Sequence, residues 1–346
     1  AAPVSVHGPP PGPLQLARYG LRHGLRARPW ARLPDLIEAH RPGRDLRDLF
    51  LRFATYFGAD PFRAPAVLHN IAWVELGLGV VAPEGGIAGL VRAYLDLAHD
   101  LGVEVRFGEE VVAIDARPNA APEVRTRSAS GPRRYRPDRL ASSLDRDRTA
   151  RLAGLRPPGV GREPSLSGMV LLLAVDGAHP EVAHHTLSMP REYAAEFAAL
   201  RAGRIPTDPT LYLAVGSRSE AGDAPAGSEA WFVMANAPAL RPDGTGVEED
   251  AYARTIMRLL HKRGWLREGE ARTVAALGPR HLAGLAERGA IYGHAPHSLL
   301  ATLRPPQRLR GLARTRLAGG TVHPGGGIPL AVLSGRQAAR DLLRSN

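Results

Sequence analysis

The C-terminal segment carries the residues whose types and spacing could most directly do chemistry. A short strand-like run from Arg316 meets Gly319 and Gly320, and residues 321–329 (TVHPGGGIP) then lead into a helical pattern. The glycines at 325–327 carry no Cβ, so a ligand can approach the backbone closely, and Pro329 fits the first turn of a helix. The free N–H groups and the dipole of that turn favour negative charge or carbonyl oxygens. The pattern therefore predicts either a helix start that receives an anion or a polar ring edge, or a flexible glycine loop before an ordinary terminal helix.

Small residues recur at helical intervals after this loop. Ala331, Ser334, Gly335 and Ala338 lie on one side of the expected helix. This spacing predicts that one face packs tightly on a sheet.

The elements that must position the loop begin with an expected α/β unit. Residues 87–101 show a strongly amphipathic helical pattern, and Gly102 stands where a C-terminal cap glycine belongs. Residues 103–107 and 110–115 alternate or carry β-branched runs, which is typical of strands. Residues 118–132 are interpreted as a polar excursion, and residues 134–140 as a possible return to a strand.

A second, mainly antiparallel sheet is expected further along the chain. Its predicted strands are residues 166–175, 210–215 and 230–235. Helices are predicted at residues 45–57, 64–78, 191–201 and 248–263. In the first of these, the apolar residues share one side, namely Leu46, Leu49, Phe50, Phe53 and Phe57.

The bulk composition indicates a globular protein and argues against nucleic-acid binding. The 346 residues are 44% hydrophobic and 23% charged, with a formal net charge of +11. Lys262 is the only lysine, and the arginines are scattered without a long basic run, so no phosphate-binding stripe is expected. There is no cysteine, which excludes disulfides and thiolate chemistry. No signal peptide and no apolar run long enough to span a membrane is visible.

Two other motifs resemble binding sites but are not interpreted as such. Residues 77–82 (GLGVVA) match Gly-x-Gly-x-x-Ala, but a helical pattern precedes them and Pro83 follows, whereas a phosphate-binding fingerprint follows a strand and opens a helix. His179, His184 and His185 cluster without a convincing carboxylate or cysteine to complete a metal site, so no metal is expected.

Several segments together resemble one family, the bacterial-type phytoene desaturases of the FAD-dependent amine oxidase-like superfamily. The glycine loop with Ser334 and Gly335 resembles the family's C-terminal flavin-binding signature, and Pro83 to Gly86 resembles its PxGG-helix segment. Further matching segments are residues 137–145, 183–186, 290–293 and 304–305. Residues 52–61 (RFATYFGADP) and 63–66 most resemble the carotenoid 3,4-desaturases of this family. The chain lacks the family's N-terminal strand, Gly-x-Gly-x-x-Gly loop and helix.

The resemblance implies an α/β (α+β) fold, namely the C-terminal portion of a two-domain flavoprotein. An FAD-binding Rossmann-like domain would carry an inserted, mainly antiparallel-sheet substrate domain. The expected segments are a Pro/Arg-rich and irregular lead at 1–45, a helical substrate-side segment at 46–85, part of the FAD domain at 86–160, the substrate domain at 161–305 and a C-terminal FAD segment at 306–346.

The resemblance also implies the cofactor site. Gly325, Gly326, Gly327, Ile328 and Pro329 would face the flavin ring of FAD. Gly319, Gly320 and His323 would lie just before them, and the backbone of Val111 resembles the position that contacts adenine. Tyr292, Gly293 and Arg304 would contact the substrate.

The implied reaction is hydride loss from an allylic C–H of an acyclic carotenoid to the flavin, followed by proton loss from the neighbouring carbon. A cation spread over the polyene lessens the need for a strong base, so positioning in a dry slot would supply most of the effect. Glu75, Glu84 and Arg304 are the candidate catalytic side chains. The alternatives are a carotenoid isomerase, an amine oxidase-like flavoenzyme, or a non-catalytic carotenoid- or membrane-binding protein.

The implied location is cytoplasmic, peripheral to the inner face of the membrane. The carotenoid is very apolar and lives in lipid, and a basic surface suits docking on anionic lipid. The oligomeric state stays open.

Overall fold

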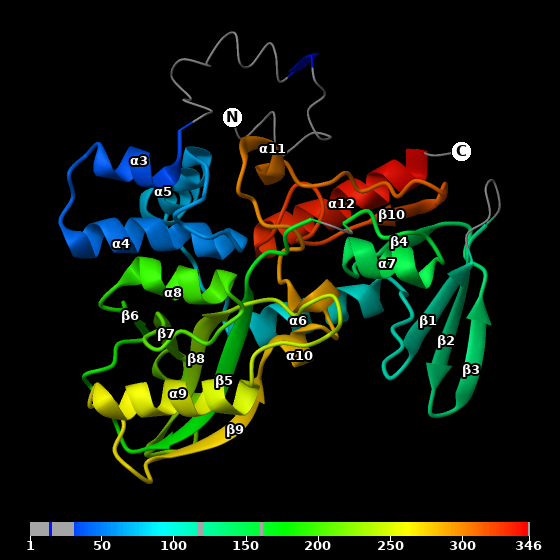
Figure 1. Ribbon diagram of the computed structural model, residues 1–346. Coiled ribbons are helices and arrows are strands. Elements are labelled where there is room, and N and C mark those ends of the chain that lie inside the picture. The colour runs from blue at the N-terminus through cyan, green and yellow to red at the C-terminus, as the bar shows by residue number, and fades with distance from the viewer. Residues whose placement is uncertain (1–13, 16–30, 116–120, 160–161, 345–346) are drawn as a thin grey trace.

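The computed structural model describes residues 14–15, 31–115, 121–159 and 162–344. The chain forms a five-stranded sheet and a three-stranded sheet. Figure 1 shows the larger sheet with its helices in one part of the molecule and the smaller sheet in another, with the C-terminal helix above and between them. The principal helices are α3 (Leu33–Glu38), α4 (Arg44–Arg52), α5 (His69–Leu78), α6 (Gly86–Asp100), α7 (Arg146–Leu152), α8 (Tyr193–Arg201), α9 (Glu249–Lys262) and α12 (Ile328–Arg344). Shorter helical elements are η1 (Phe53–Phe57), η2 (Ala66–Leu68), η3 (Gly216–Arg218), η4 (Ala221–Asp223), α10 (Pro279–Leu282), η5 (Glu287–Gly289) and α11 (Leu299–Thr302).

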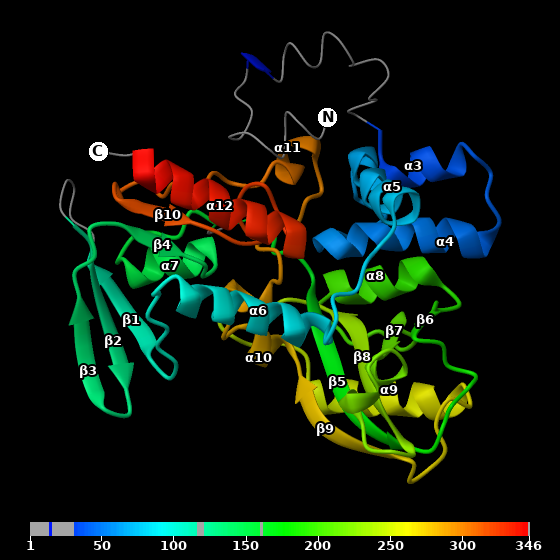
Figure 2. The same ribbon diagram turned by 180° about the vertical axis from the view of Figure 1, so that it is seen from behind.

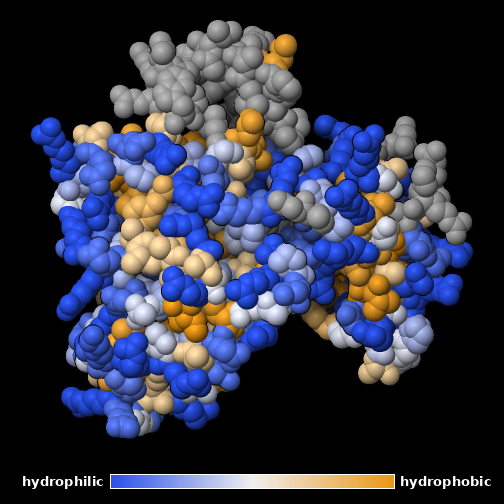
Figure 3. Space-filling model, in the orientation of Figure 1, coloured by the Kyte–Doolittle hydropathy of each residue, from blue (hydrophilic) through white to orange (hydrophobic). Residues whose placement is uncertain are grey.

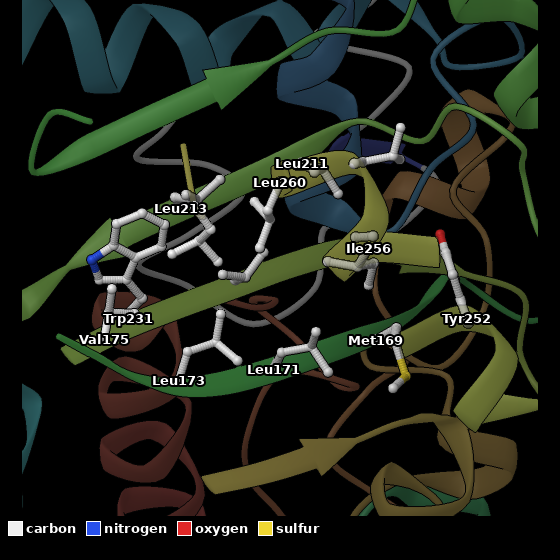
Figure 4. Close-up of a cluster of buried hydrophobic side chains, with 14 of the residues drawn as sticks. Met169, Leu171, Leu173, Val175, Leu211, Leu213, Trp231, Tyr252, Ile256 and Leu260 are labelled. Carbon is white, nitrogen blue, oxygen red and sulfur yellow. The ribbon is translucent and has the colours of Figure 1, made fainter. Parts of the chain in front are cut away.

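The large sheet is antiparallel throughout, as its sequence pattern predicts. Its order is β6-β7-β8-β5-β9. The strands are β5 (Ser167–Asp176), β6 (His185–Ser188), β7 (Leu211–Val215), β8 (Ser228–Ala237) and β9 (Ala271–Leu277). Alternate residues of β5 point to one face, where Leu171, Leu173 and Val175 are buried because α9 covers that face with Ile256 and its neighbours. Figure 4 shows these side chains pointing toward one another from the strands and α9.

A second core joins the helices of the N-terminal part to α8. Leu33, Leu51 and Ala54 pack there with Tyr193 and Phe197, whose rings meet at 5.2 Å. Figures 1 and 2 both show α4 alongside α8, on the side of the large sheet away from β9. This second core holds η1 in place, and η1 in turn places Phe57 beside the glycine loop.

A parallel two-stranded ladder supports the C-terminal helix. β4 (Leu140–Ser142) pairs in parallel with β10 (Thr315–Leu317), and α12 lies against both strands. The short strand and the helix that contains Pro329 in its first turn are therefore confirmed. Ser334 and Ala338 are fully buried on the face of α12 whose small residues predict close packing. The smaller sheet, β1 (Glu110–Asp115), β2 (Glu123–Ser128) and β3 (Gly131–Tyr135), is antiparallel, and β1 lies near α7.

Several sequence-based predictions for local structure are wrong. Residues 103–107 have no ladder partner in the described part of the chain and form no strand, although their alternation is correct for one. Residues 118–132 contain β2 and the start of β3, because arginine-rich strands lack the apolar signal of a buried sheet. Leu33–Glu38 form a helix at the end of the segment expected to be an irregular lead, and most of that segment, residues 1–13 and 16–30, lies outside the described residues.

The apolar side expected within residues 45–57 is buried only at its C-terminal end. Phe53 is buried and Phe57 packs on the second core, but Leu46, Leu49 and Phe50 are 54%, 37% and 36% exposed, and in α4 the buried residues are Asp48, Leu51 and Arg52. Helical periodicity identifies an apolar stripe but does not determine which side meets a neighbour. Arg52 turns inward instead, toward a tyrosine ring of β7.

Helix α6 spans Gly86–Asp100, within one residue of the predicted bounds at each end, and Gly102 follows its C-cap residue with a left-handed φ of 71°, as expected for a cap glycine. None of its residues is buried, and Ile87 and Val91 are more than half exposed. Figure 3 shows a mostly hydrophilic face, with the outline of the molecule indented between the two sheets. Among the described residues, no helix has both the length and the apolar content that crossing a bilayer requires.

Asp341 anchors α12, and this contact predicts acid sensitivity. Its carboxylate accepts hydrogen bonds from Arg308 at 2.8 and 3.1 Å and from buried Arg316, and the bond from Arg308 is the main reason that the pKa of Asp341 is lowered to about 2. A lowered carboxyl pKa stabilises the fold above the unfolded value, and that contribution is lost as pH falls from about 4 toward 2. After allowance for solvent screening, the contribution is on the order of 1 kcal/mol.

We therefore expect Asp341→Asn to lower the Tm at neutral pH, and we expect its difference from the wild type to shrink between about pH 4 and pH 2. Thermal unfolding followed by circular dichroism across that range measures this difference. Asp96→Asn on exposed α6 is the matched control. A difference that stays constant from pH 7 to pH 2 contradicts the assignment.

Candidate functional site

The glycine loop lies against two stacked aromatic rings. Phe57, at the end of η1, stacks on Tyr292 with ring centroids 6.1 Å apart. A Cβ built on Gly326 would lie 2.2 Å from Cε1 of Tyr292, and one built on Gly325 would lie 3.3 Å from the ring of Phe57. Gly320 also packs closely on the loop, because a Cβ built on it would lie 3.2 Å from Cα of Gly326. The glycines are therefore required by close packing and not only by chain flexibility.

Arg304 holds these rings and the loop together. It is 3% exposed, and its Nη1 donates to the carbonyls of Tyr292 and His294 at 3.0 and 2.8 Å. Its Nη2 donates to the carbonyl of Phe57 at 3.2 Å, and its Cζ lies 4.0 Å from the centroid of the Phe57 ring. Burial lowers the pKa of this guanidinium to about 10, so it remains charged at neutral pH. Arg304 thereby joins the end of η1 to the 292–294 loop.

Ser334 of α12 positions the other side of the loop. Its Oγ donates to the carbonyl of His323 at 3.0 Å and accepts from the N–H of Gly319 at 3.1 Å and from Nε2 of Gln307 at 2.9 Å. Gln307 also donates to the carbonyl of Ser334 at 2.7 Å. One hydroxyl therefore connects the beginning and the middle of the glycine segment to the helix that follows it. The sequence marks Ser334 as a small residue within the segment that resembles the flavin-binding signature, and it gives no signal for Gln307.

Ser334→Ala is expected to destabilise the chain by about 2 kcal/mol, because it leaves buried donors and an acceptor around the loop without their partner. Urea unfolding, with the free energy extrapolated to water, measures this loss. Ala338→Ser, at the other fully buried small position of the same face, tests whether any change of side-chain size there has the same effect. A loss below about 0.5 kcal/mol for Ser334→Ala contradicts its positioning role.

The remaining predicted cofactor residues line the start of α12 or lie apart from it. Gly327 has a φ of 93° and nothing within 4 Å of its missing side chain, and Ile328 is 43% exposed, so the helix start is open on that side. Pro329 follows in the first turn. His323 is buried, and its N–H donates to the carbonyl of Pro305 at 2.8 Å. Val111 lies in β1, which is linked to the loop region through α7 and the β4–β10 ladder.

Gly293 and Tyr292 belong to the same site. Tyr292 donates its N–H to Oγ of Ser165 at 3.0 Å, and burial raises the pKa of its hydroxyl. The missing side chain of Gly293 faces Thr321 at 3.5 Å and Asp145 at 3.9 Å. Asp145 caps α7 by accepting from the N–H groups of Asp147 and Arg148, and burial raises its pKa.

A small cavity of about 40 Å³ lies beside this contact, and Asp145, His294 and Thr321 contribute to its lining. Residues 137–145 belong to the segments that carry the family resemblance, but the sequence does not indicate that Asp145 meets the 292–294 loop.

The two candidate glutamates lie elsewhere. Glu84 is exposed, just before α6. Glu75 lies on α5, where burial raises its pKa and the charge of Arg52 lowers it. The structure therefore groups Arg304, Tyr292, Gly293 and the glycine loop, places Glu75 with Arg52, and leaves Glu84 at the surface. Among the described residues, no cluster of three histidine, aspartate or glutamate side chains is arranged to hold a metal.

Comparison with solved structures identifies the fold. No protein-family model matches the chain. A solved oxidoreductase from Methanosarcina mazei superposes with a TM-score of 0.59 at 16% identity, over 95% of this chain and 72% of that one. The chain therefore has the fold of this oxidoreductase.

Sequence comparison identifies homologues of the chain. A hydroxyneurosporene desaturase from Cereibacter sphaeroides is 35% identical over 325 residues, and a 1-hydroxycarotenoid 3,4-desaturase from a Flavobacterium species is 30% identical over 306 residues. The alignments cover 91% and 85% of this chain and 64% and 61% of those relatives. Carotenoid desaturases are therefore homologues of this chain, which spans less than two thirds of the length of these relatives.

Proposed function

We propose that this chain serves in the FAD-dependent desaturation of an acyclic carotenoid, at the 3,4 bond of a hydroxylated molecule. The observation that carries the proposal is the glycine loop at the start of α12, packed on the Phe57–Tyr292 pair and held by Arg304. The relatives from Cereibacter sphaeroides and the Flavobacterium species, which are named for hydroxylated carotenoids, support the choice of substrate.

The residues of the loop fit the ring end of a flavin. Gly327 leaves open space beside the backbone, and the first turn of α12 offers N–H groups and a dipole to the polar edge of a ring. Gly325 to Pro329 would hold that edge, with Gly319, Gly320 and His323 supporting them from the preceding turn. For the nucleotide end of FAD, Val111 is the one residue assigned. The Gly-x-Gly-x-x-Ala motif at residues 77–82 is not assigned to it, because these residues run from the end of α5 into coil instead of opening a helix after a strand.

Flavin supplies a hydride acceptor when bound, and with a proton lost from the neighbouring carbon the substrate loses two hydrogens and gains one double bond. The chain itself contributes orientation and exclusion of water. Both Nη groups of the charged Arg304 donate to carbonyls, and its buried Nε has no hydrogen-bond partner among the described residues, so Arg304 is assigned a positioning role and not a role in proton transfer. Glu84 is exposed, and Glu75 lies with Arg52 and apart from the glycine loop, so neither carboxylate is assigned the role of proton acceptor.

The proposed location is the surface of a membrane, at its cytoplasmic face, because the substrate is lipid-soluble. Trp73, in the middle of α5, is 65% exposed, and Val80 and Val81, just after that helix, are 75% and 92% exposed. The chain carries a formal net charge of +11. We expect the chain to sediment with vesicles that contain anionic lipid and to be released by salt. Equal sedimentation with neutral vesicles, or partition that is insensitive to salt, contradicts this mode of docking.

The test of function is conversion of a defined polyene. The chain is incubated with FAD and a 1-hydroxylated acyclic carotenoid in detergent, and the products are separated and weighed by mass spectrometry. The expected product lacks two hydrogens and absorbs at longer wavelength than the substrate. Recovery of an isomer of unchanged mass would instead support an isomerase.

A further inference from the structure

Arg52, at the C-terminal end of α4, is a buried cation. It is 6% exposed, and its Nε is buried without a hydrogen-bond partner among the described residues. Within the ranges that the structure describes, its guanidinium forms no ion pair. A buried charge without a partner destabilises a fold, so its presence at this position calls for a compensating contact.

Aromatic rings surround this guanidinium. Its Cζ lies 5.1 Å from the ring centroid of Tyr56 and 5.5 Å from that of Tyr212 on β7. Tyr212 in turn contacts Phe232 on β8 at 6.3 Å and His185 on β6 at 5.9 Å. Tyr212 and Phe232 lie on the face of the large sheet that α9 does not cover, whereas Tyr56 belongs to η1. Tyr56 and Phe232 are 38% and 36% exposed, so the cluster is open to an incoming ligand.

Nearby carboxylates are committed to other partners. Glu196 accepts from Thr210 and Asn236, and Asp48 accepts from Arg47 at 2.9 Å. Glu75 remains within electrostatic range of Arg52. A guanidinium only donates, a carboxylate only accepts, and a hydroxyl does both. A neutral hydroxyl on an apolar chain therefore suits this place better than an anion, which the surrounding carboxylates would repel.

We propose that Arg52, with Glu75 and the rings of Tyr56 and Tyr212, binds the oxygen-bearing end of the substrate and makes the protein selective for a hydroxylated polyene. This inference rests on the proposed function and adds to it the residues that read the end group. Arg52 is a specificity residue in this account, since it contacts the substrate away from the bond that changes.

The position along the chain agrees with this role. Arg52 and Phe57 lie at opposite ends of η1, which separates their backbones by about 10 Å at the rise of a 3₁₀-helix. The ring of Phe57 meets Gly325 of the glycine loop. An end group bound at Arg52 therefore keeps the adjoining part of the polyene close to the loop.

The test compares binding of a 1-hydroxylated acyclic carotenoid with binding of the same polyene without the hydroxyl, in matched micelles. Quenching of tryptophan fluorescence reports binding without turnover. The wild type is expected to bind the hydroxylated polyene at least tenfold more tightly. Arg52→Met is expected to remove this preference and to leave the affinity for the unsubstituted polyene within about twofold of the wild type. Its Tm should be unchanged or higher, because the variant removes a buried unpaired charge.

Arg258→Met, on α9 across the sheet, is the matched control and should keep the preference. Arg52→Lys should retain part of it. A preference that survives Arg52→Met overturns the proposal, as does an equal loss of affinity for both polyenes with a lower Tm, which indicates a structural role. A wild type that binds both polyenes equally contradicts only this inference, whereas a wild type that binds neither contradicts the proposed function itself.

Discussion

Gly326→Ala is expected to lower the stability of the chain by about 3 kcal/mol, which corresponds to a fall in Tm of roughly 5 °C. The new methyl group would lie 2.2 and 2.4 Å from two carbons of the Tyr292 ring. That ring cannot move aside freely, because it stacks on Phe57 and its backbone is held by Arg304 and Ser165. Gly326 does not have a positive φ, so the expected loss comes from the clash alone. Flavin affinity should fall with it, because the loop must shift.

Gly335→Ala on the same helix is the matched control. A Cβ there meets nothing within 4 Å, and alanine favours the interior of a helix over glycine by about 0.5–1 kcal/mol. The control should therefore be slightly more stable than the wild type and bind flavin equally well. Differential scanning calorimetry and flavin titration measure both quantities. Wild-type stability and flavin affinity in Gly326→Ala would contradict the packing described for the loop.

Arg304→Met is expected to cost about 3 kcal/mol and to weaken flavin binding by tenfold or more. Each of three buried carbonyls loses its donor, at roughly 1–3 kcal/mol each, and the removal of a buried charge offsets part of that sum. The consequence for binding follows from geometry, because the 292–294 loop and Phe57 are no longer held together. A displacement on the order of 1 Å in a positioned site changes rates by about a hundredfold.

Arg304→Lys separates charge from geometry. Lysine keeps the charge but lacks the planar fork that reaches several carbonyls at once, so its effect should be intermediate. Arg310→Met, at an exposed position close by in the sequence, should leave Tm and flavin affinity unchanged. If Arg304→Met matched Arg310→Met in both measurements, Arg304 would have no positioning role.

Strong local patterns predicted much of the fold. The strands that became β5, β7 and β8 have apolar runs bounded by polar turns, and α9 and α12 have clear helical spacing, so these elements follow from the sequence. Short β6 and exposed β9 lack such a signal. Residues 103–107 have the sequence signal of a strand but do not form one. Their alternation fits a strand, but a strand forms only where a neighbouring segment provides the hydrogen-bond partners of the ladder.

The candidate site was predictable in part for a related reason. The glycine loop and its helix are contiguous in the chain, so the types and spacing of their residues are enough to indicate their chemistry. The contacts that position them come from distant segments: Phe57, Tyr292 and Ser165 are brought together only by the fold. Arg52 could not be distinguished among scattered arginines, because its burial and its aromatic surroundings are properties of tertiary packing.

The most direct test of the central claim is anaerobic visible spectroscopy of the chain reconstituted with FAD. Protein-bound flavin should show its oxidised absorption bands, and addition of a 1-hydroxylated acyclic polyene should bleach them while the polyene absorption moves to longer wavelength. An oxidised flavin spectrum that the polyene leaves unchanged, with the polyene recovered intact, would contradict the account.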